Sequence, residues 1–406
     1  MATVSDGAIP IVQRLTSAQR RAVWAGFLGW TLDAFDFFLI VFMLKAIAAD
    51  FGVGVKDVSE ALFLTLASRP LGALVFGRLA DRVGRRPVLM GVILAFSVLS
   101  ALSGAAGSLT QLLLVRALFG FAMGGEWGLG ASLVMETVPA AARGRVSGLL
   151  QAGYPAGYLL ASLAYFLFFD AIGWRWMFVL GLAPALLVAF IRARVEESPV
   201  FLARRHEDAA PLRALAAHWK RGLYLVVLMT AFTTFSHGTQ DMYPTFLQEQ
   251  HGLSTKVTGT ITLLMNLGAI CGALAFGMLS HRLGRQRTII AAAVLAAPVI
   301  PLWAYGDGVA QLAAGAVLMQ FAVQGAWSMV PAYLNELSPF AIRATFPGVV
   351  YQLGNLLSSR NVVFQADLAA SRGGDYGFAL ATVAGITIVV LVVWTAFGPH
   401  PQDDMA

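Results

Sequence analysis

Residues 77–86 read GRLADRVGRR and residues 277–286 read GMLSHRLGRQ, so one glycine- and arginine-rich segment occurs twice, 200 positions apart. Both copies begin with glycine, and they also share Leu79, Arg82, Gly84 and Arg85 of the first copy. At the same offset, Glu136, Pro139 and Arg143 recur as Glu336, Pro339 and Arg343. These matches at one offset predict a structural unit that is present twice in parallel orientation, a plan found in many secondary transporters.

The composition predicts that this repeated unit lies in a membrane. Of 406 residues, 58% are hydrophobic and only 12% are charged, whereas soluble domains carry about 25% charged residues. A helix needs about 20 apolar residues to cross a bilayer, and it satisfies its own backbone hydrogen bonds there. The sequence therefore predicts an all-α membrane protein with twelve transmembrane helices in two six-helix pseudo-repeats. We expect spans at residues 23–46, 58–78, 87–106, 110–135, 145–169, 174–192, 221–247, 257–280, 288–305, 309–335, 344–366 and 377–398.

The longest polar stretch divides the chain into two halves. We expect an N-terminal six-helix bundle over residues 1–192, a cytoplasmic linker over 193–220 and a C-terminal six-helix bundle over 221–406. Within the second bundle, Pro298 and Pro301 weaken the ninth span as a continuous helix.

The basic residues predict the orientation. Of the 28 lysines and arginines, 20 fall on one side of the spans, five on the other and three within spans. Cytoplasmic loops are rich in lysine and arginine, so we expect both termini in the cytoplasm. The formal net charge of +6 is then a topology signal, and nucleic acid is not an expected partner. Cys271 is the only cysteine, which excludes an intramolecular disulfide and a thiolate metal cluster, and the short loops favour a bacterial inner membrane.

Ionisable residues within spans mark binding sites or proton relays. In the first span, Asp33 and Asp36 share a helical face at i and i+3. Burial in apolar surroundings favours the neutral form of a carboxyl group, so such a residue can carry a proton. The fourth span holds Arg116 and Glu126, and the glycines between them predict close helix packing.

The seventh span contains the most polar segment. Ser236, His237, Gln240 and Asp241 form one polar face on an otherwise apolar helix. At the 200-residue offset Ser236 coincides with Asp36, so we expect both residues to border one central cavity. A lone histidine in a helix is usually structural, but histidine titrates near neutrality and relays protons. Its grouping with Gln240 and Asp241 favours a functional site.

The segment from Gly77 to Arg86 resembles the loop signature of the major facilitator superfamily, and the whole chain fits the 6+6 plan of that family. Glycines there let two helices approach, while an acid and arginines can form ion pairs that hold an inward gate shut. We assign this gating loop to Gly77, Asp81, Arg82, Gly84, Arg85 and Arg86. In the second copy His281 replaces the acid, which weakens that half of the latch. The alternative is that these arginines only fix the topology.

Spans 1, 4 and 7 are similar to those of the sialate/metabolite:proton symporters, which include fungal-type lactate/pyruvate permeases. The span 7 signature, Asn-x-x-Ser/Thr-His-x-Ser/Thr-Gln-Asp-x-x-x-Thr, is matched except at Thr233, which replaces the asparagine. The resemblance implies that Asp36 pairs with Arg116, which competes with a proton for the carboxylate; a fixed structural ion pair is the alternative. The residues expected to couple protons are Asp33, Asp36, Glu126, His237 and Asp241.

An anionic substrate needs a cation, and guanidinium binds a carboxylate through two parallel hydrogen bonds. The candidates are Arg69, Arg116 and Arg360. We expect Arg69 to pair with Asp241 when no substrate is bound, whereas Arg360 lies nearer the outer face, where snorkelling is the alternative. The neutral candidates for substrate binding are Ser236, Gln240, Asn355, Tyr351 and Tyr154, although packing is the commoner role of a tyrosine.

These features predict proton-coupled uptake of a small organic carboxylate, such as lactate or pyruvate, by alternating access. The alternatives are symport of sialic acid or another organic acid, and proton-coupled export. The chain lacks the motifs of metalloproteases and serine hydrolases, so we do not expect an enzyme. It also lacks the repeated charge ring of a channel filter. The expected partners are a carboxylate anion, protons and the lipid bilayer, without cofactor or metal, and the protein is expected to be a monomer.

Overall fold

The computed structural model describes residues 15–203 and 216–399, and within these ranges all regular structure is helical. The linker expected at 193–220 is thus described at its two ends only. Four basic residues that contribute to the charge asymmetry lie outside the described residues: Arg14, Arg204, Arg205 and Arg213.

The first half contains six spans. They are built from α1 (Ser17–Phe51), α2 (Val55–Val83), α3 (Arg85–Gly104), α4 (Leu109–Met123), α5 (Glu126–Thr137), α6 (Ala140–Gln151), α7 (Gly153–Leu180) and α8 (Ala183–Arg194). The fifth and sixth spans meet inside α7 at Gly173, whose φ of 69° is a left-handed conformation that glycine adopts readily. The short helix α9 (Pro199–Ala203) follows α8.

The second half repeats this plan. It consists of α11 (Trp219–Gln240), α12 (Tyr243–Glu249), α13 (Thr255–Leu283), α14 (Arg285–Ala296), η2 (Ala297–Val299), α15 (Ile300–Ala304), α16 (Val309–Trp327), α17 (Val330–Glu336), η3 (Phe340–Ile342), α18 (Thr345–Ser358), α19 (Asn361–Ser371) and α20 (Tyr376–Ala396). The ninth span is broken where Pro298 and Pro301 predict, because η2 interrupts it between α14 and α15.

Two further breaks within spans lie beside polar residues. The fourth span is broken at Gly124 and Gly125, between α4 and α5, and the seventh at Asp241 and Met242, between α11 and α12. Irregular backbone at membrane depth is tolerated where it is buried in protein or lines a cavity. These interruptions therefore point to the interior of the molecule as the place of the functional site.

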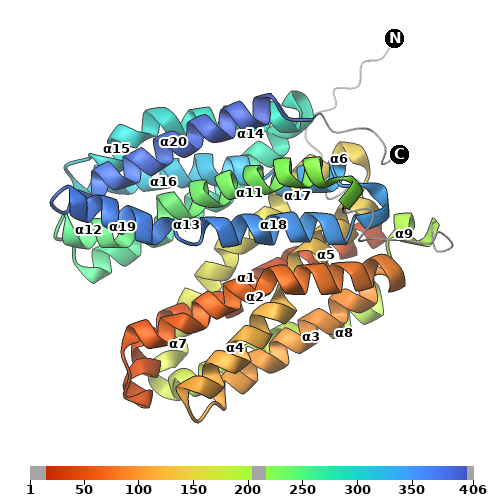
Figure 1. Ribbon diagram of the computed structural model, residues 1–406, viewed down its shortest axis with the longest axis horizontal. Coiled ribbons are helices and arrows are strands. Elements are labelled where there is room, and N and C mark those ends of the chain that lie inside the picture. The colour runs from red at the N-terminus through yellow and green to blue at the C-terminus, as the bar shows by residue number, and fades with distance from the viewer. Residues whose placement is uncertain (1–14, 204–215, 400–406) are drawn as a thin grey trace.

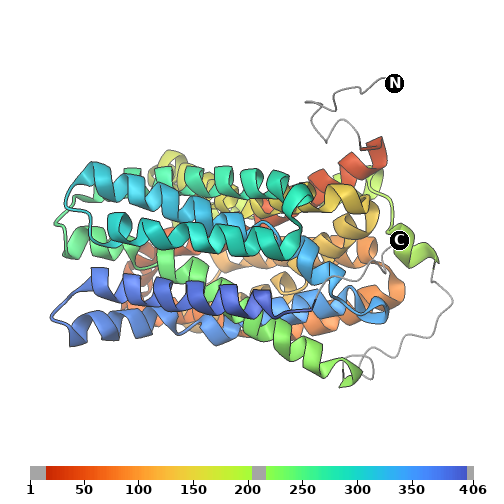
Figure 2. The same ribbon diagram turned by 90° about the horizontal axis from the view of Figure 1, so that it is seen from above.

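The two halves lie side by side as two helical bundles (Figures 1 and 2). In Figure 1, α12, α15 and α19 lie at one end of the molecule and α9 at the other. We call the latter the arginine-rich end, because the α2–α3 and α13–α14 turns lie there. The described ends of the chain are also at this end: Gln19 donates a hydrogen bond to the carbonyl of Thr137, and Gln286 donates one to that of Pro399.

The halves pack closely at the arginine-rich end because glycines remove side chains from the interface. α2 packs on α18, where a Cβ atom at Gly77 would lie 2.6 Å from the Cα of Thr345. α6 packs on α13, where a Cβ atom at Gly148 would lie 2.9 Å from the Cα of Gly277. Gly77 of the gating loop therefore permits close contact between the two halves.

The outer surface suits a bilayer. Eight helical segments of the described chain are long and apolar enough to cross a membrane, by length and composition. Large apolar side chains point outward, among them Leu71, Leu114, Phe166, Leu186 and Val389. Such a surface would be unfavourable in water but is the expected contact with lipid tails.

Candidate functional site

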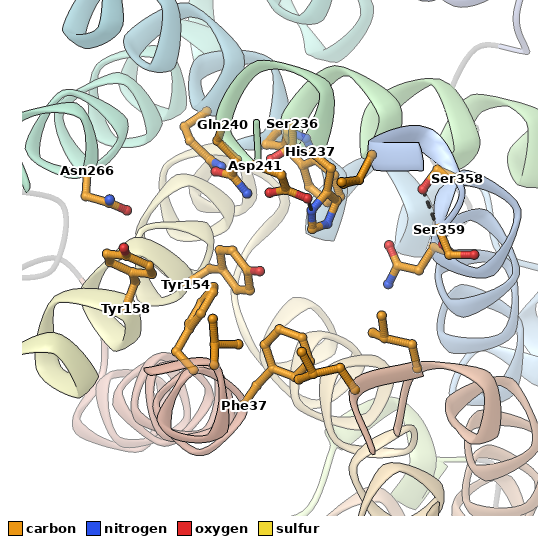
Figure 3. A pocket seen from close by; sticks show the side chains of 18 of the residues that line it. Phe37, Tyr154, Tyr158, Ser236, His237, Gln240, Asp241, Asn266, Ser358 and Ser359 are labelled. Carbon is orange, nitrogen blue, oxygen red and sulfur yellow. Dashed lines mark hydrogen bonds and ion pairs between the residues drawn. The ribbon is translucent and has the colours of Figure 1, made fainter. Parts of the chain in front are cut away.

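A central cavity of about 430 Å³ lies between the two halves. Helices α1, α2 and α7 contribute to its wall from the first half, and α11, α13, α16 and α18 from the second. Figure 3 shows Ser236, His237 and Asp241 on the second half, facing Phe37 and Tyr154 of the first half across the cavity. The polar face expected on the seventh span is therefore turned to the interior.

Charged lining residues are few. Within the described chain, Arg69 is the one arginine or lysine that lines the cavity, and Asp241 is the one carboxylate. Nδ1 of His237 lies 2.9 Å from Oδ2 of Asp241, as their i, i+4 spacing on one helix predicts. The expected pair between Arg69 and Asp241 is not formed. Arg69 instead directs Nη2 to the sulfur of Met123 at 2.7 Å, a weak acceptor, and its guanidinium lies 5.0 Å from the ring centre of Phe37.

Neutral polar side chains surround these charges. Ser236 and Gln240 line the cavity as expected, as do Asn355 and the two tyrosines, Tyr154 and Tyr351. The sequence did not point to three further amide side chains in the wall, which come from three different spans: Gln151, Asn266 and Gln324. The oxygens of Gln151 and Gln324 are buried and have no hydrogen-bond partner among the described residues, so they are available to a ligand. An amide within an apolar span was the signal that would have identified them.

Five aromatic residues, which we call the aromatic cluster, connect the halves beside the cavity: Trp30, Trp127, Tyr154, Trp327 and Tyr351. Trp127 stacks on Tyr351 with ring centres 4.0 Å apart, and Trp30 stacks on Tyr154 at 5.5 Å. Trp327 meets Tyr351 edge-on at 6.0 Å. All but Trp127 line the cavity. The aromatic cluster gives the cavity an apolar surface next to the charge of Arg69.

The acids of the first half are enclosed behind the cavity wall. Asp33, Asp36 and Glu126 are buried and do not line the cavity, which corrects the expectation that Asp36 borders it together with Ser236. Arg69 interacts electrostatically with both Asp33 and Glu126. Arg69 therefore links these enclosed acids to the cavity.

The expected ion pair between Asp36 and Arg116 is also not formed. Asp36 accepts a hydrogen bond of 2.8 Å from the hydroxyl of Ser100. Arg116 is fully buried, its guanidinium lies 3.8 Å from the ring centre of Phe119, and its nitrogens have no hydrogen-bond partner among the described residues. The two charges still interact electrostatically. Arg116 does not line the cavity, so in this conformation it does not reach a substrate there.

Arg360 lies away from the cavity. It is exposed and precedes α19, and it is absent from the cavity wall. Arg360 is therefore not placed to bind a substrate in this cavity. Of the three arginines considered for carboxylate binding, only Arg69 is brought to the cavity.

The gating loop joins the two halves through Asp81. Its carboxylate accepts hydrogen bonds from the backbone N–H groups of Ala344 (3.0 Å) and Thr345 (3.1 Å), and from the Thr345 hydroxyl (2.6 Å). These groups form the N-terminal end of α18, where the helix dipole stabilises a negative charge. Asp81 also lies 3.4 Å from Arg85 of its own half. The expected ion pair is thus present, but the contact that crosses between the halves is a helix cap that the sequence did not reveal.

The arginines of the gating loop bind within their own half. Arg85 lies 3.1 Å from Glu136, and the repeat-related Arg285 lies 2.8 Å from Glu336. The same ion pair therefore occurs in both halves, at positions related by the 200-residue offset.

The other residues of the gating loop differ in role. Gly84 has a φ of 112°, a conformation strained for other residues. Arg86 donates a hydrogen bond of 2.6 Å to the carbonyl of Arg192, while Arg82 is exposed. In the second copy, Nδ1 of His281 lies 2.7 Å from a carbonyl of its own helix. The latch is thus asymmetric, as the replacement of the acid by His281 indicates.

The comparisons with known proteins agree with this architecture. The sequence profile of the Major Facilitator Superfamily matches residues 26–359 and 241–404. The chain therefore belongs to the Major Facilitator Superfamily, and it is a membrane transporter and not an enzyme.

Two relatives are similar to this chain over most of its length, and one solved structure has the same fold. The chain is 26% identical to the sialic acid transporter NanX of Escherichia coli K12, over 94% of this chain and 95% of the relative. It is 28% identical to a carboxylic acid transporter protein homolog of Saccharomyces cerevisiae, over 89% of this chain and 63% of the relative. The structure of the proton:xylose symporter XylE superposes with a TM-score of 0.75 at 18% identity, over 94% and 96% of the two chains, which concerns the fold alone.

Proposed function

We propose that this transporter takes up a small organic carboxylate together with protons, by alternating access. The observation that carries the proposal is the position of Arg69, the one lysine or arginine among the described lining residues, with only a thioether as its hydrogen-bond partner. A buried guanidinium without a carboxylate partner favours an anion strongly, because the site is partly desolvated. The names of two relatives, which refer to sialic acid and to carboxylic acid, support the same substrate class.

Protons are proposed to act at two groups of residues. His237 and Asp241 form the group in the cavity wall. The enclosed acids Asp33, Asp36 and Glu126 form the other. Protonation removes the negative charge that competes with the substrate for arginine, so a carboxylate and a proton stabilise each other in the cavity.

The contacts between the halves suggest how access alternates. In the structure the hydrogen bonds between halves gather at the arginine-rich end, around Asp81 and Thr345. This end is proposed to be cytoplasmic, since it carries most of the lysines and arginines. The present conformation then has its cytoplasmic end closed, and release of the substrate requires the Asp81 cap to break. The bundles at residues 1–192 and 221–406 are proposed to move as units about the linker at 193–220.

Lactate or pyruvate is the proposed substrate, on the basis of the span 7 signature, with sialic acid and other organic acids as alternatives. The test is uptake of radiolabelled lactate by the purified protein in proteoliposomes, with pyruvate, sialic acid and a cationic dye as competitors. Competition by pyruvate alone supports the proposal, and competition by sialic acid selects the alternative. Competition by the cationic dye alone would instead favour proton-coupled export of cations.

A further inference from the structure

A second, water-sized cavity lies beside Glu126. It has a volume of about 10 Å³, close to the space that one water molecule occupies. Residues of both halves line it: Glu126, Gly26 and Gly130 belong to the first half, and Pro331 of α17 belongs to the second. The cavity thus lies in the interface that separates when the halves move.

Trp30 stands between this small cavity and the central one, because it lines both. Trp127 follows Glu126 directly and stacks on Tyr351 of the second half with ring centres 4.0 Å apart. The aromatic cluster therefore separates Glu126 from the substrate cavity in this conformation.

The carboxyl group of Glu126 is unusually poor in partners. Glu126 is only 1% exposed, and its Oε2 atom has no hydrogen-bond partner among the described residues. Its Oε1 rests on Gly29, where a Cβ atom would lie only 2.5 Å away. The charged groups that act on it are Asp33 from α1 and Arg69 from α2, while Pro331 across the small cavity brings no charge.

We infer that Glu126 releases the transported proton towards the arginine-rich end. This inference rests on the proposed function. When the halves part, Pro331 moves away from Glu126 and water enters the small cavity. The O–H bond of the Glu126 carboxyl group breaks, the proton passes to this water, and the carboxylate remains near Arg69. The aromatic cluster prevents the same proton from returning to the substrate cavity, so the proton and the substrate leave by separate paths.

The ratio of the rate of net uptake to the rate of exchange tests this role of Glu126. Exchange of labelled for unlabelled carboxylate needs no proton release, whereas net uptake driven by a pH gradient does. In Glu126→Gln the ratio of net uptake to exchange should fall by about a hundredfold, the usual size of a lost proton transfer group. Glu126→Asp, which keeps the carboxyl group, should retain most of this ratio. If wild-type uptake does not depend on the pH gradient, the proposed function is contradicted. If wild-type uptake depends on the gradient and Glu126→Gln retains the wild-type ratio of net uptake to exchange, only this inference is contradicted.

Labelling of the small cavity gives a readout that does not depend on transport by a Glu126 variant. Ala131 also lines this cavity and is buried, so Ala131→Cys in a Cys271→Ser background reports access to it. Ser359→Cys in the same background reports access to the central cavity. A membrane-impermeant thiol reagent should reach Ala131→Cys only from the arginine-rich side and Ser359→Cys from the opposite side. Labelling of Ala131→Cys from the opposite side, at the rate of Ser359→Cys, would overturn the inference.

Discussion

The carboxylate of Asp81 caps the N-terminal end of α18 in the other half of the molecule, with its Oδ2 atom 2.6 Å from the hydroxyl and 3.1 Å from the backbone nitrogen of Thr345. Asp81 is almost fully buried, so these hydrogen bonds are made away from water. A carboxylate at a helix N-terminus is stabilised both by the N–H groups and by the helix dipole. This cap connects the gating loop to the second half, and we propose that it holds the arginine-rich end closed.

Replacing Asp81 by Asn should open the arginine-rich end. The variant keeps the size of the side chain but loses the charge, and hydrogen bonds to a charged group are worth about 2 kcal/mol. Since about 1.4 kcal/mol is a factor of ten, the equilibrium should shift by about thirtyfold towards the conformation with this end open. The reporter is Ala332→Cys in a Cys271→Ser background, because Ala332 is fully buried between the halves. Its labelling by a thiol reagent from the arginine-rich side should become faster in Asp81→Asn.

The matched control for this variant is His281→Asn. His281 is the repeat-related residue, but it is exposed and contacts its own helix. Its substitution should leave the labelling rate of Ala332→Cys unchanged. Equal acceleration by both substitutions would contradict the role of the Asp81 cap.

A side chain at Gly148 should also prevent closure. A Cβ atom there would clash with the backbone carbonyl of Ala273 and lie 2.9 Å from the Cα of Gly277. Overpacking of this kind costs about 1–3 kcal/mol, and this cost arises only in the closed conformation. Gly148→Ala should therefore accelerate the labelling of Ala332→Cys. Gly259→Ala on α13, where a Cβ atom meets no atom within 4 Å, is the control and should have no effect.

Arg69 should decide the affinity for the carboxylate. Arg69→Lys retains the charge but loses the planar fork, so the KM for lactate should rise by about tenfold. Arg69→Gln removes the charge, and uptake should fall below detection. Arg360→Gln removes the charge of an exposed arginine outside the cavity and should leave the KM unchanged. A larger KM change in Arg360→Gln than in Arg69→Lys would reverse the assignment.

Asp241 should make uptake depend on the outer pH. The wild-type rate should rise as the outer pH falls from about 8 to about 5, the range in which histidine groups gain a proton. Asp241→Asn removes the carboxylate that contacts His237 at 2.9 Å, so this variant should show little pH dependence and no accumulation against a gradient. Asp307→Asn removes an exposed acid from outside the cavity and should retain the wild-type profile. Full accumulation by Asp241→Asn would exclude its role in coupling.

The architecture could be predicted from the sequence because its signals are local or periodic. Apolar length predicts the spans, and the 200-residue offset predicts the repeat. The contacts Arg85–Glu136 and Arg285–Glu336, which the sequence did not predict, lie at positions related by this offset. The spacing of His237 and Asp241 places both on one helical face, and their contact follows from helix geometry alone.

Contacts between helices could not be predicted in the same way. Asp36 is buried, but its partner is Ser100 of α3, and Arg116 lies against Phe119 instead. Arg69 and Asp241 both line the cavity, yet Arg69 is directed to Met123 and not to Asp241. Helical periodicity predicts which face of a helix carries a residue. Which other residues contact that face depends on how the helices pack in the bundles.

The central claim, that a carboxylate and protons enter together, is tested most directly by the pH inside proteoliposomes. Lactate is added outside in the absence of a pH gradient, a pH-sensitive dye reports the inner pH, and the signal of protein-free liposomes is subtracted. We predict that lactate entry through the wild-type protein is accompanied by acidification of the interior. Arg69→Gln should show neither lactate entry nor acidification. Lactate entry through the wild-type protein without any acidification would contradict the account.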